Sequence, residues 1–403
     1  MGQTIRGSGN DDLRTLHQLS TGEYILTGYS QSGISGDKSQ ASQGATDYWV
    51  IKISSTGGKI WDKRFGGSGD DWVEASVVNS DGSIVLAGRS ASGVSGDKSQ
   101  ASQGGRDFWV IKINSTGSKV WDKRFGGTGN EDANAMVATS DGYLIGGLST
   151  SGISGDKSQS SQGGSDFWII KINLSGTKLW DKRFGGTLTE DLRSIIKTTD
   201  GGFLLGGKSD SGVSGDKSQG SQGGTDYWSV KINSSGTRQW DKRFGGSVAE
   251  ELRTVIQTSD GGYLLAGRSD SGISGDRTQA SQGGTDYWMV KVSSSGGAGL
   301  IASARTEAEQ ASEEMEISMG LKADPNPFTE KITISFTLPQ TEQVRLKVYN
   351  SQGLEVSTLF EGEAEKDKAY EFEWNANDQN PGMYIIRLGS ESKMESRKVI
   401  LVR

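Results

Sequence analysis

The sequence repeats one segment of about sixty residues five times, and this repetition restricts the possible folds more than any other feature. The heptapeptide WDKRFGG recurs unchanged, with its Trp at positions 61, 121, 180 and 240. Two further markers, Asp-aromatic-Trp and Ser-Gly-Asp-Lys/Arg, recur five times in the same phase. A segment of this length cannot bury its apolar face alone, so we expect each copy to stack against its neighbours.

The sequence pattern within each copy predicts four short antiparallel strands. Residues 252–258 and 263–268 are two strands joined by a Ser-Asp-Gly-Gly turn. A Gly/Ser-rich loop leads to the alternating strand 286–292, and a strand of the kind at 119–125 completes the copy. The charges of this fourth strand suit an exposed sheet edge. We therefore predict an all-β chain in which residues 1–297 form a five-bladed β-propeller, with an open β-array as the alternative.

The two ends of the array hold less than a full copy. The fifth copy stops after its third strand, and residues 2–7 stand where WDKRF would precede the first copy. We expect residues 2–7 to supply the fourth strand of the last blade and to close the ring, because closure removes unpaired strand edges. The alternative is an N-terminus cut inside a longer array.

Composition and motifs exclude several kinds of site. The chain has no Cys and a single His, His17, which excludes disulfides, thiolate metal sites and repeated histidine chemistry. A net charge of −7 gives no electrostatic case for nucleic acid, and no apolar run approaches the ~18 residues of a membrane span. Because G-x-S-x-G, H-E-x-x-H and P-loop motifs are absent, we expect no catalytic residue, no resident cofactor and no enzyme.

The most uniform polar stretch outside the strands is the loop Ser-Gly-x-Ser-Gly-Asp-Lys-Ser-Gln. Its aspartates are candidate ligand-binding residues, since they can accept hydrogen bonds from sugar hydroxyls or bind Ca²⁺ together with nearby carbonyls. They are Asp37, Asp97, Asp156, Asp216 and Asp276. The alternative is a structural loop in which Asp caps a turn, and the single carboxylate in each loop favours that alternative.

The Asp-aromatic-Trp marker has a structural interpretation. We expect its Asp, such as Asp107, to accept hydrogen bonds from the preceding loop. Its Trp, such as Trp109, is expected in the core rather than stacked on a sugar, because it lies on the period-two face of a strand. Trp72 lies outside the repeated pattern, and we consider it a candidate exposed residue.

The composition changes after residue 297. Residues 298–322 lack the Gly/Trp pattern and predict an acidic linker. Residues 323–403 contain short alternating strands, and about 80 residues with six or seven such strands fit a small antiparallel sandwich.

Residues 324–403 closely resemble the type A C-terminal sorting domain of the type IX secretion system of Bacteroidetes. The resemblance rests on DPNPF at 324–328, ISFTLP at 334–339, VYNSQG at 348–353, FEW at 372–374, GMY at 382–384 and the basic-apolar end 398–403. The motif residues it implies are Pro325, Asn326, Pro327, Phe328, Tyr349, Gly353, Gly382, Tyr384 and Lys398. It implies an immunoglobulin-like sandwich that directs periplasmic cargo to an outer-membrane translocon and to sortase-like attachment machinery.

The same resemblance implies a secreted or cell-surface protein attached to the outer membrane. Such cargo carries a Sec signal peptide, and the segment MGQTIRGSGNDD has no apolar signal core, so we expect a further N-terminal extension. The repeats are also similar, more loosely, to Gly/Ser/Trp repeats in surface proteins of these bacteria, which names no activity.

The leading functional prediction is a monomeric adhesion module that binds glycans or other surface macromolecules through its repeated loops, with a multivalent gain. A polysaccharide hydrolase that uses carboxylates on the rim is one alternative. A structural spacer that binds nothing is the other.

Overall fold

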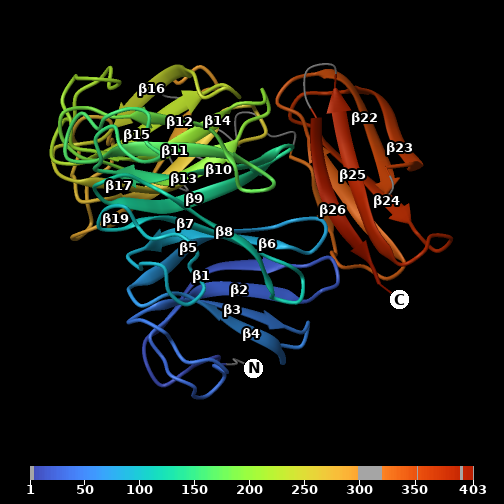
Figure 1. Ribbon diagram of the computed structural model, residues 1–403. Helices are drawn as coiled ribbons and strands as arrows, with labels where there is room; N and C mark the ends of the chain where they lie inside the picture. The colour runs from blue at the N-terminus through green and yellow to red at the C-terminus, as the bar shows by residue number, and fades with distance from the viewer. Residues whose placement is uncertain (1–3, 298–319, 352, 391–393, 403) are drawn as a thin grey trace. The chain divides into compact units, whose positions relative to one another are not determined.

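The computed structural model describes residues 4–297, 320–351, 353–390 and 394–402, and every regular element in these ranges is a β-strand (Figure 1). The all-β class is therefore confirmed. The chain divides into two compact units, Met1–Ile301 and Ala302–Arg403, here called the repeat region and the C-terminal domain. Within the described ranges, no helix has the length and apolar character needed to cross a membrane.

The repeat region contains five antiparallel sheets, one for each sequence repeat. Repeats 1 and 2 form β1 (Asp11–Gln18), β2 (Tyr24–Ser30), β3 (Asp47–Ile53), β4 (Lys59–Phe65), β5 (Asp71–Val78), β6 (Ile84–Ser90), β7 (Asp107–Ile113) and β8 (Lys119–Phe125). Repeat 3 forms β9 (Glu131–Thr139), β10 (Gly142–Ser149), β11 (Asp166–Asn173) and β12 (Lys178–Phe184). Repeats 4 and 5 form β13 (Glu190–Lys197), β14 (Phe203–Ser209), β15 (Asp226–Ile232), β16 (Arg238–Phe244), β17 (Glu250–Gln257), β18 (Tyr263–Ser269) and β19 (Asp286–Val292).

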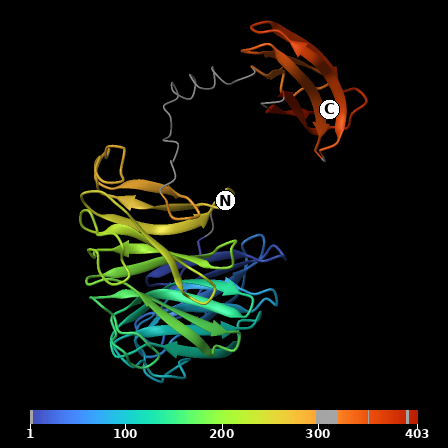
Figure 2. The same cartoon turned by 90° about the horizontal axis from the view of Figure 1, so that it is seen from above.

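In every sheet the strands pair in chain order, so each repeat is a four-stranded meander, except that the described sheet of repeat 5 has three strands. The sheets follow one another from the blue end of the chain to the yellow-orange end (Figure 2). First strands of successive repeats, such as β5 and β9, lie against each other and line the inner side of the series. This series of blade-like sheets confirms the propeller-like class that the repeat predicts.

The apolar core lies between neighbouring sheets, at contacts that we call seams. At the seam between repeats 1 and 2, Tyr48 and Val50 of one sheet pack against Val73 and Trp109 of the next. Because each sheet covers its neighbour, no repeat has a complete core of its own.

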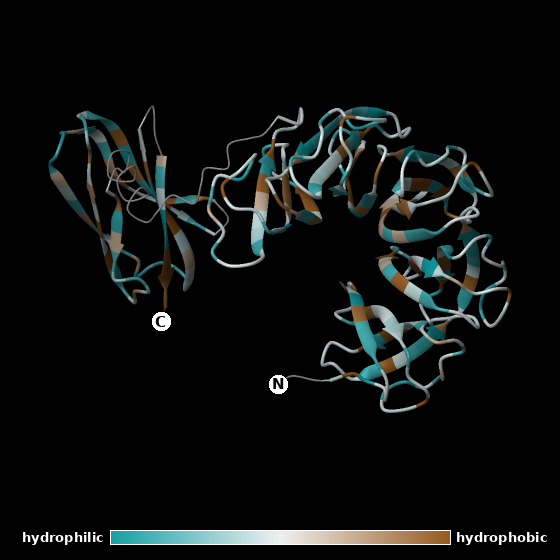
Figure 3. Ribbon diagram, turned by 90° about the vertical axis from the view of Figure 1, so that its left-hand side faces the viewer, coloured by the Kyte–Doolittle hydropathy of each residue, from teal (hydrophilic) through white to brown (hydrophobic). Residues whose placement is uncertain are grey.

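The sheets form an arc that stays open between the first and the last repeat (Figure 3). The expectation that residues 2–7 complete the last sheet is wrong for their described part, Thr4–Gly7. None of these residues pairs with β19, and the backbone of Arg6 instead bonds to Asp37 of repeat 1. The physical reason is that the first and last sheets do not meet across the open side of the arc.

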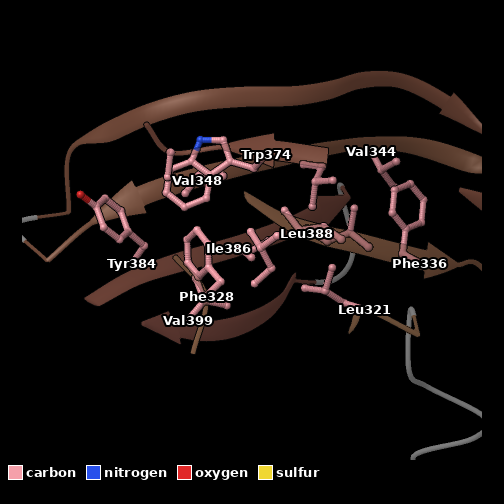
Figure 4. Close-up of a cluster of buried hydrophobic side chains, with 14 of the residues drawn as sticks. Leu321, Phe328, Phe336, Val344, Val348, Trp374, Tyr384, Ile386, Leu388 and Val399 are labelled. Atoms are coloured by element: carbon pink, nitrogen blue, oxygen red, sulfur yellow. The ribbon is translucent and has the colours of Figure 1, made fainter. Parts of the chain in front are cut away.

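The C-terminal domain is a sandwich of two antiparallel sheets with orders β20-β21-β24 and β23-β22-β25-β26. Its strands are β20 (Lys322–Asp324), β21 (Lys331–Thr337), β22 (Glu342–Asn350), β23 (Glu355–Ala364), β24 (Ala369–Asn375), β25 (Gly382–Ser390) and β26 (Met394–Leu401). Side chains from both sheets meet in one core, where Phe328 lies among Trp374, Ile386 and Val399 (Figure 4). The predicted sandwich is confirmed.

The predicted linker, residues 298–322, lies outside the described residues up to position 319. Its last two residues belong to the C-terminal domain, since Leu321 is buried in the core and Lys322 begins β20.

Each first strand of the repeat region carries a bulge, and a glycine on the second strand makes room for it. In repeat 2 the bulge lies between Val73 and Ala75, and a Cβ on Gly88 would collide with the carbonyl oxygen of Trp72. The equivalent positions are Gly28, Gly147, Gly207 and Gly267.

We expect Gly88→Ala to lower the free energy of unfolding by about 1–3 kcal/mol, because the added methyl group must displace backbone. Gly93→Ala is the matched control, since a Cβ there meets nothing within 4 Å, and its effect should stay within about 0.5 kcal/mol. Urea unfolding of both variants measures the difference, and equal losses would contradict the steric argument.

Candidate functional site

The five candidate loops are anchored by a buried basic side chain. Lys98 is 2% exposed, and its Nζ donates to the backbone oxygen of Ser92 and to the hydroxyls of Ser90 and Ser102. Burial lowers the pKa of Lys98 to about 8, although the nearby carboxylates of Asp71 and Asp107 oppose that shift. The lysine therefore holds the loop against its own sheet, and it is not available to a ligand. Lys38, Lys157 and Lys217 are buried in the same way, and Arg277 takes this place in repeat 5.

The loop aspartates join neighbouring repeats. Arg64, near the end of β4, donates from Nη1 to Oδ2 of Asp97 at 2.8 Å, and the amide of Asp97 donates to the carbonyl of Gly66. We call this pair the Arg–Asp clasp. It recurs as Arg124–Asp156, Arg183–Asp216 and Arg243–Asp276, at 2.8, 2.7 and 2.6 Å. Asp37 in repeat 1 lacks an Arg partner and accepts a hydrogen bond from the amide of Arg6.

A second aspartate, in the WDKRF motif, holds three separate parts of each repeat together. Oδ2 of Asp122 accepts from the indole of Trp109 at 3.2 Å and from the amide of Ser99 at 2.8 Å, while Oδ1 accepts from Lys119 at 2.9 Å. Burial alone would raise the pKa of Asp122, but these hydrogen bonds outweigh it and lower the pKa. The fourth strand is the edge of each four-stranded sheet, as predicted, but its Asp is buried in this network instead of facing solvent.

The aspartate of the Asp-aromatic-Trp motif bonds to the same loop. Oδ2 of Asp107 accepts from the amide of Gln103 at 2.8 Å, which confirms its expected role toward the preceding loop. Burial raises the pKa of Asp107 to about 6, and the neighbouring Glu131 contributes. Within the described residues, Oδ1 of Asp107 has no hydrogen-bond partner. It lies over Gly126, where a side chain would collide with it.

The repeated tryptophans lie in the seams, as expected, and not on a sugar-binding surface. Trp109 is fully buried and lies 5.0 Å from the ring of Tyr48 in the preceding repeat. The equivalent pairs across the next seams are Phe108–Trp168, Phe167–Trp228 and Tyr227–Trp288, at 4.9, 4.8 and 4.9 Å. This ladder of rings joins the five repeats.

The residues that differ between repeats gather along the inner side of the arc. We call them the inner strip, and they occupy three equivalent positions in each repeat. The inner strip consists of Asp12, Arg14, Tyr29, Trp72, Glu74, Arg89, Asp132, Asn134, Leu148, Asp191, Arg193, Lys208, Glu251, Arg253 and Arg268. Six are basic and five are acidic, whereas the seam positions mostly keep apolar or aromatic side chains.

Polar contacts run along the inner strip from repeat to repeat. Arg14 pairs with Glu74 at 3.3 Å across the first seam, and Arg89 pairs with Asp132 at 3.7 Å across the second. Asn134 donates to Asp191 at 3.1 Å across the third. Lys208 and Glu251 meet at 3.1 Å across the fourth, where Arg253 and Arg268 also reach Glu251. The strip is therefore one connected surface.

An aromatic pair lies at the repeat 1 end of the inner strip. The rings of Tyr29 and Trp72 stack at 4.5 Å, and the guanidinium of Arg89 lies 4.3 Å from the centre of the Trp72 ring. Trp72 is half-buried, so it is less exposed than expected. Its buried Nε1 has no hydrogen-bond partner among the described residues. Sequence reasoning missed the strip, although the divergence between otherwise identical repeats could have revealed it.

Carboxylates in the inner strip are partly withdrawn from water. Burial raises the pKa of Glu74, and Arg14, Arg89 and Arg193 oppose the shift. Burial likewise raises the pKa of Asp191, with Arg193 and Lys208 in opposition. Among the described residues no three carboxylate or imidazole groups gather where they could hold a metal ion, and calcium binding by the loops stays an untested prediction.

The sorting-motif residues come together at one end of the C-terminal domain. The side chain of Asn326 donates to the carbonyl of Lys398 at 2.8 Å and accepts from the amide of Ile400 at 2.9 Å, which fastens the segment 325–327 to β26. Phe328 is buried 5.7 Å from the ring of Trp374. The hydroxyl of Tyr384 donates to the carbonyl of Asn380 at 2.7 Å.

The remaining motif residues serve the turns and the outer faces of the sandwich. Gly353 has φ 79° in the turn after β22, as expected, and Gly382 has φ 152° at the start of β25. Tyr349 lies under the guanidinium of Arg387 at 4.9 Å.

Comparison with known families identifies the C-terminal domain. Residues 323–402 match the family model described as the secretion system C-terminal sorting domain. The chain therefore carries a type IX sorting domain, which indicates export through that secretion system and a secreted or cell-surface location.

The chain also has more distant similarities. A curated relative, the regulatory protein FlaEY of Caulobacter vibrioides, is 23% identical over 62% of this chain, which spans about a quarter (26%) of that relative. A glycoside hydrolase family 43 arabinoxylan arabinofuranohydrolase of Bacillus subtilis has 10% identity and a TM-score of 0.32, over 96% of this chain and 78% of its own. An apocarotenoid oxygenase of Synechocystis has 11% identity and a TM-score of 0.35, over 63% and 55%.

The expectation that the chain is not an enzyme is corrected by this comparison, because the similar solved structures are enzymes. At 10 and 11% identity they assign no activity or substrate to this chain.

We expect Asp156→Ala to lower the free energy of unfolding by about 1.5–3 kcal/mol, because it leaves the largely buried Arg124 with only its longer contact to Asp107 at 3.6 Å. Asp37→Ala is the matched control in the same loop of repeat 1, where no Arg is paired, and it should cost less than about 1 kcal/mol. Urea unfolding at neutral pH compares the two variants, and equal losses would show that the clasp contributes no stability of its own.

Proposed function

We propose that this chain is an exported surface protein whose repeat region binds a glycan along the inner strip. The sorting domain supports delivery to the cell exterior, and attachment to the outer membrane is part of the proposal. The observation that carries the binding site is the contrast between seams that mostly keep apolar and aromatic side chains and an inner strip whose charges change from repeat to repeat. Residues that only hold a repeat array together can be the same in each copy, whereas a surface that fits one ligand differs along its length.

The chemistry of the inner strip suits a polyhydroxylated ligand. The stacked rings of Tyr29 and Trp72 lie against two guanidinium groups, Arg14 over Tyr29 and Arg89 over Trp72, so this end of the strip presents charged donors held in place by aromatic rings. Arg253 and Arg268 keep about half of their side-chain surface exposed while they hold Glu251 between them. Such groups can donate and accept hydrogen bonds from neighbouring hydroxyls.

The repeated loops are less suited to this role than the sequence suggested. From repeat 2 to repeat 5, each loop aspartate already accepts hydrogen bonds from an Arg and from a glycine amide of the preceding repeat. A ligand at these loops would have to compete with the clasp. Binding through the loops is therefore the alternative that the experiment must distinguish from binding along the inner strip.

We expect Trp72→Ala to weaken binding of the full-length protein to its best ligand on a glycan array by about tenfold or more, because it removes the ring that holds the guanidinium of Arg89 in place. Trp72→Phe should keep most of the affinity, and Leu179→Ala, on the outer strand β12, should leave it unchanged. Isothermal calorimetry gives the affinities, and release of reducing sugar in the same mixtures separates binding from hydrolysis.

Three results would contradict the proposal in different ways. If Asp37→Ala weakened binding while Trp72→Ala did not, the site would lie in the loops. If the array held no ligand, the spacer alternative would stand. An unfolded Trp72→Ala variant would be recognised by its unfolding curve, and Arg253→Ala would then replace it as the test of the strip.

We expect deletion of residues 323–403 to abolish delivery to the cell surface, because this domain carries the sorting motif. Surface fractionation and protease accessibility of cells that express both forms measure the effect. The control is Lys366→Ala, an exposed residue between β23 and β24 and outside the segments that carry the resemblance, which should be delivered normally. Unchanged delivery of the deletion would show that another segment carries the export signal.

A further inference from the structure

The two end repeats expose surfaces that every internal seam buries. Tyr287 of β19 is 97% exposed, whereas its equivalents Tyr48, Phe108, Phe167 and Tyr227 are fully buried. Beside it, Met289 is 55% exposed, whereas Val50, Val110 and Ile169 at the same position are fully buried. We call this surface of repeat 5 the tyrosine face. Its ring occupies the position that elsewhere contacts the Trp of the following repeat.

Repeat 1 exposes the opposite surface of a seam, which we call the tryptophan face. Leu13 is 55% exposed, and its equivalents Val73, Ala133, Leu192 and Leu252 are fully buried. Leu13, Leu26, Trp49 and Ile51 line a hollow of about 230 Å³ at this face. Among the tryptophans of this motif in the described structure, only Trp49 has no repeat before it. The hollow lies where the aromatic ring of a preceding repeat would pack.

We propose that the tyrosine face of one copy of this chain binds the tryptophan face of a second copy, head to tail. The contact would reproduce an internal seam and place Tyr287 of one copy against Trp49 of the other. The four internal Tyr/Phe–Trp pairs show which surface each face accepts. This departs from the expectation of a monomer, and it does not depend on the proposed glycan site.

The N-terminal segment of the second copy fits the same arrangement. Arg6 and Gly7 contact the first loop and first strand as Gly66 and Gly67 contact the next repeat, so Ile5 is in phase with Phe65. In repeat 1, Phe65 pairs directly with Tyr48 across the sheet. Ile5 of the second copy would therefore pair with Tyr287 and continue the sheet beyond the open edge of β19.

A second copy fits these faces better than the opposite end of the same chain. Each internal seam is fixed by a buried ring pair and by an Arg–Asp clasp, and the arc stays open between its ends (Figure 3). Closing the arc within one chain would require all four seams to shift together. An uncovered strand edge and an apolar face instead favour association with another molecule.

The new contact should be weaker than an internal seam. Position 4, in phase with Arg64, is Thr, so the second copy brings no guanidinium to form a clasp, and its Asp37 stays with the amide of Arg6. The association should therefore be reversible and depend on concentration. A head-to-tail contact of this kind produces either closed rings or open chains.

Cysteine cross-linking tests the contact directly, because the natural chain contains no Cys. Full-length Tyr287→Cys and Ile5→Cys proteins, carrying different tags, are mixed and oxidised. We expect a disulfide-linked heterodimer, since directly paired strand residues lie within reach of a disulfide. Ile34→Cys replaces Ile5→Cys in the control, because Ile34 is more accessible than Ile5 but lies in a loop away from both faces, and it should give no heterodimer.

Sedimentation velocity of the unmodified protein provides an independent measurement. We expect larger species as the concentration rises, and Tyr287→Ser should require at least tenfold more protein for the same degree of association. Since Tyr287 is almost fully exposed in the single chain, this substitution should not affect folding. Ile34→Ser should associate like the natural protein.

Two outcomes would overturn the proposal. The double variant Ile5→Cys/Tyr287→Cys could form its disulfide within one chain, which would show that the arc closes on itself. Alternatively, the protein could sediment as a monomer at all concentrations and the mixed variants form no heterodimer, which would show that the two faces do not bind each other.

Discussion

The contact between consecutive repeats is the interaction on which the rest of the repeat region depends. A single sheet has two apolar faces and no partner within its own sequence, so its core exists only where the next sheet covers it. The ring pair supplies the apolar part of that contact, and the Arg–Asp clasp fixes its register at the edge. In the WDKRF motif, Arg and Phe act at this contact, while Asp joins three parts of its own repeat.

This constraint separates the positions that hold the repeats together from the positions that can vary. Positions in the apolar core of a seam mostly keep apolar or aromatic side chains, because each repeat is both the upper and the lower partner of a seam. Side chains outside that core can change their charge, and the inner strip joins such residues into one connected surface. Divergence among internal repeats therefore locates a candidate binding surface without any knowledge of related proteins.

The sequence predicted the parts of the fold that repeat and missed the contacts between distant residues. The strand pattern, the buried Trp109 and the sorting sandwich follow from periodicity, turns and motif spacing. The partner of Asp97 is thirty-three residues away in another sheet, so no local pattern shows that its carboxylate is already engaged. Ring closure was predicted wrongly because phase alone does not tell whether two ends meet in space.

Because the chain has no cysteine, its stability depends more strongly on the seams and on what covers the end faces. An exported array without disulfides must obtain its stability from packing between repeats, so its least stable parts are the first and last sheets, each covered on one face only. Internal repeats gain two seams, whereas repeat 1 and repeat 5 gain one. Tyr287 and Leu13 lie on the two surfaces where that missing seam would form. A partner that covers either surface, as the proposed second copy would, therefore stabilises the array at one of its weakest points.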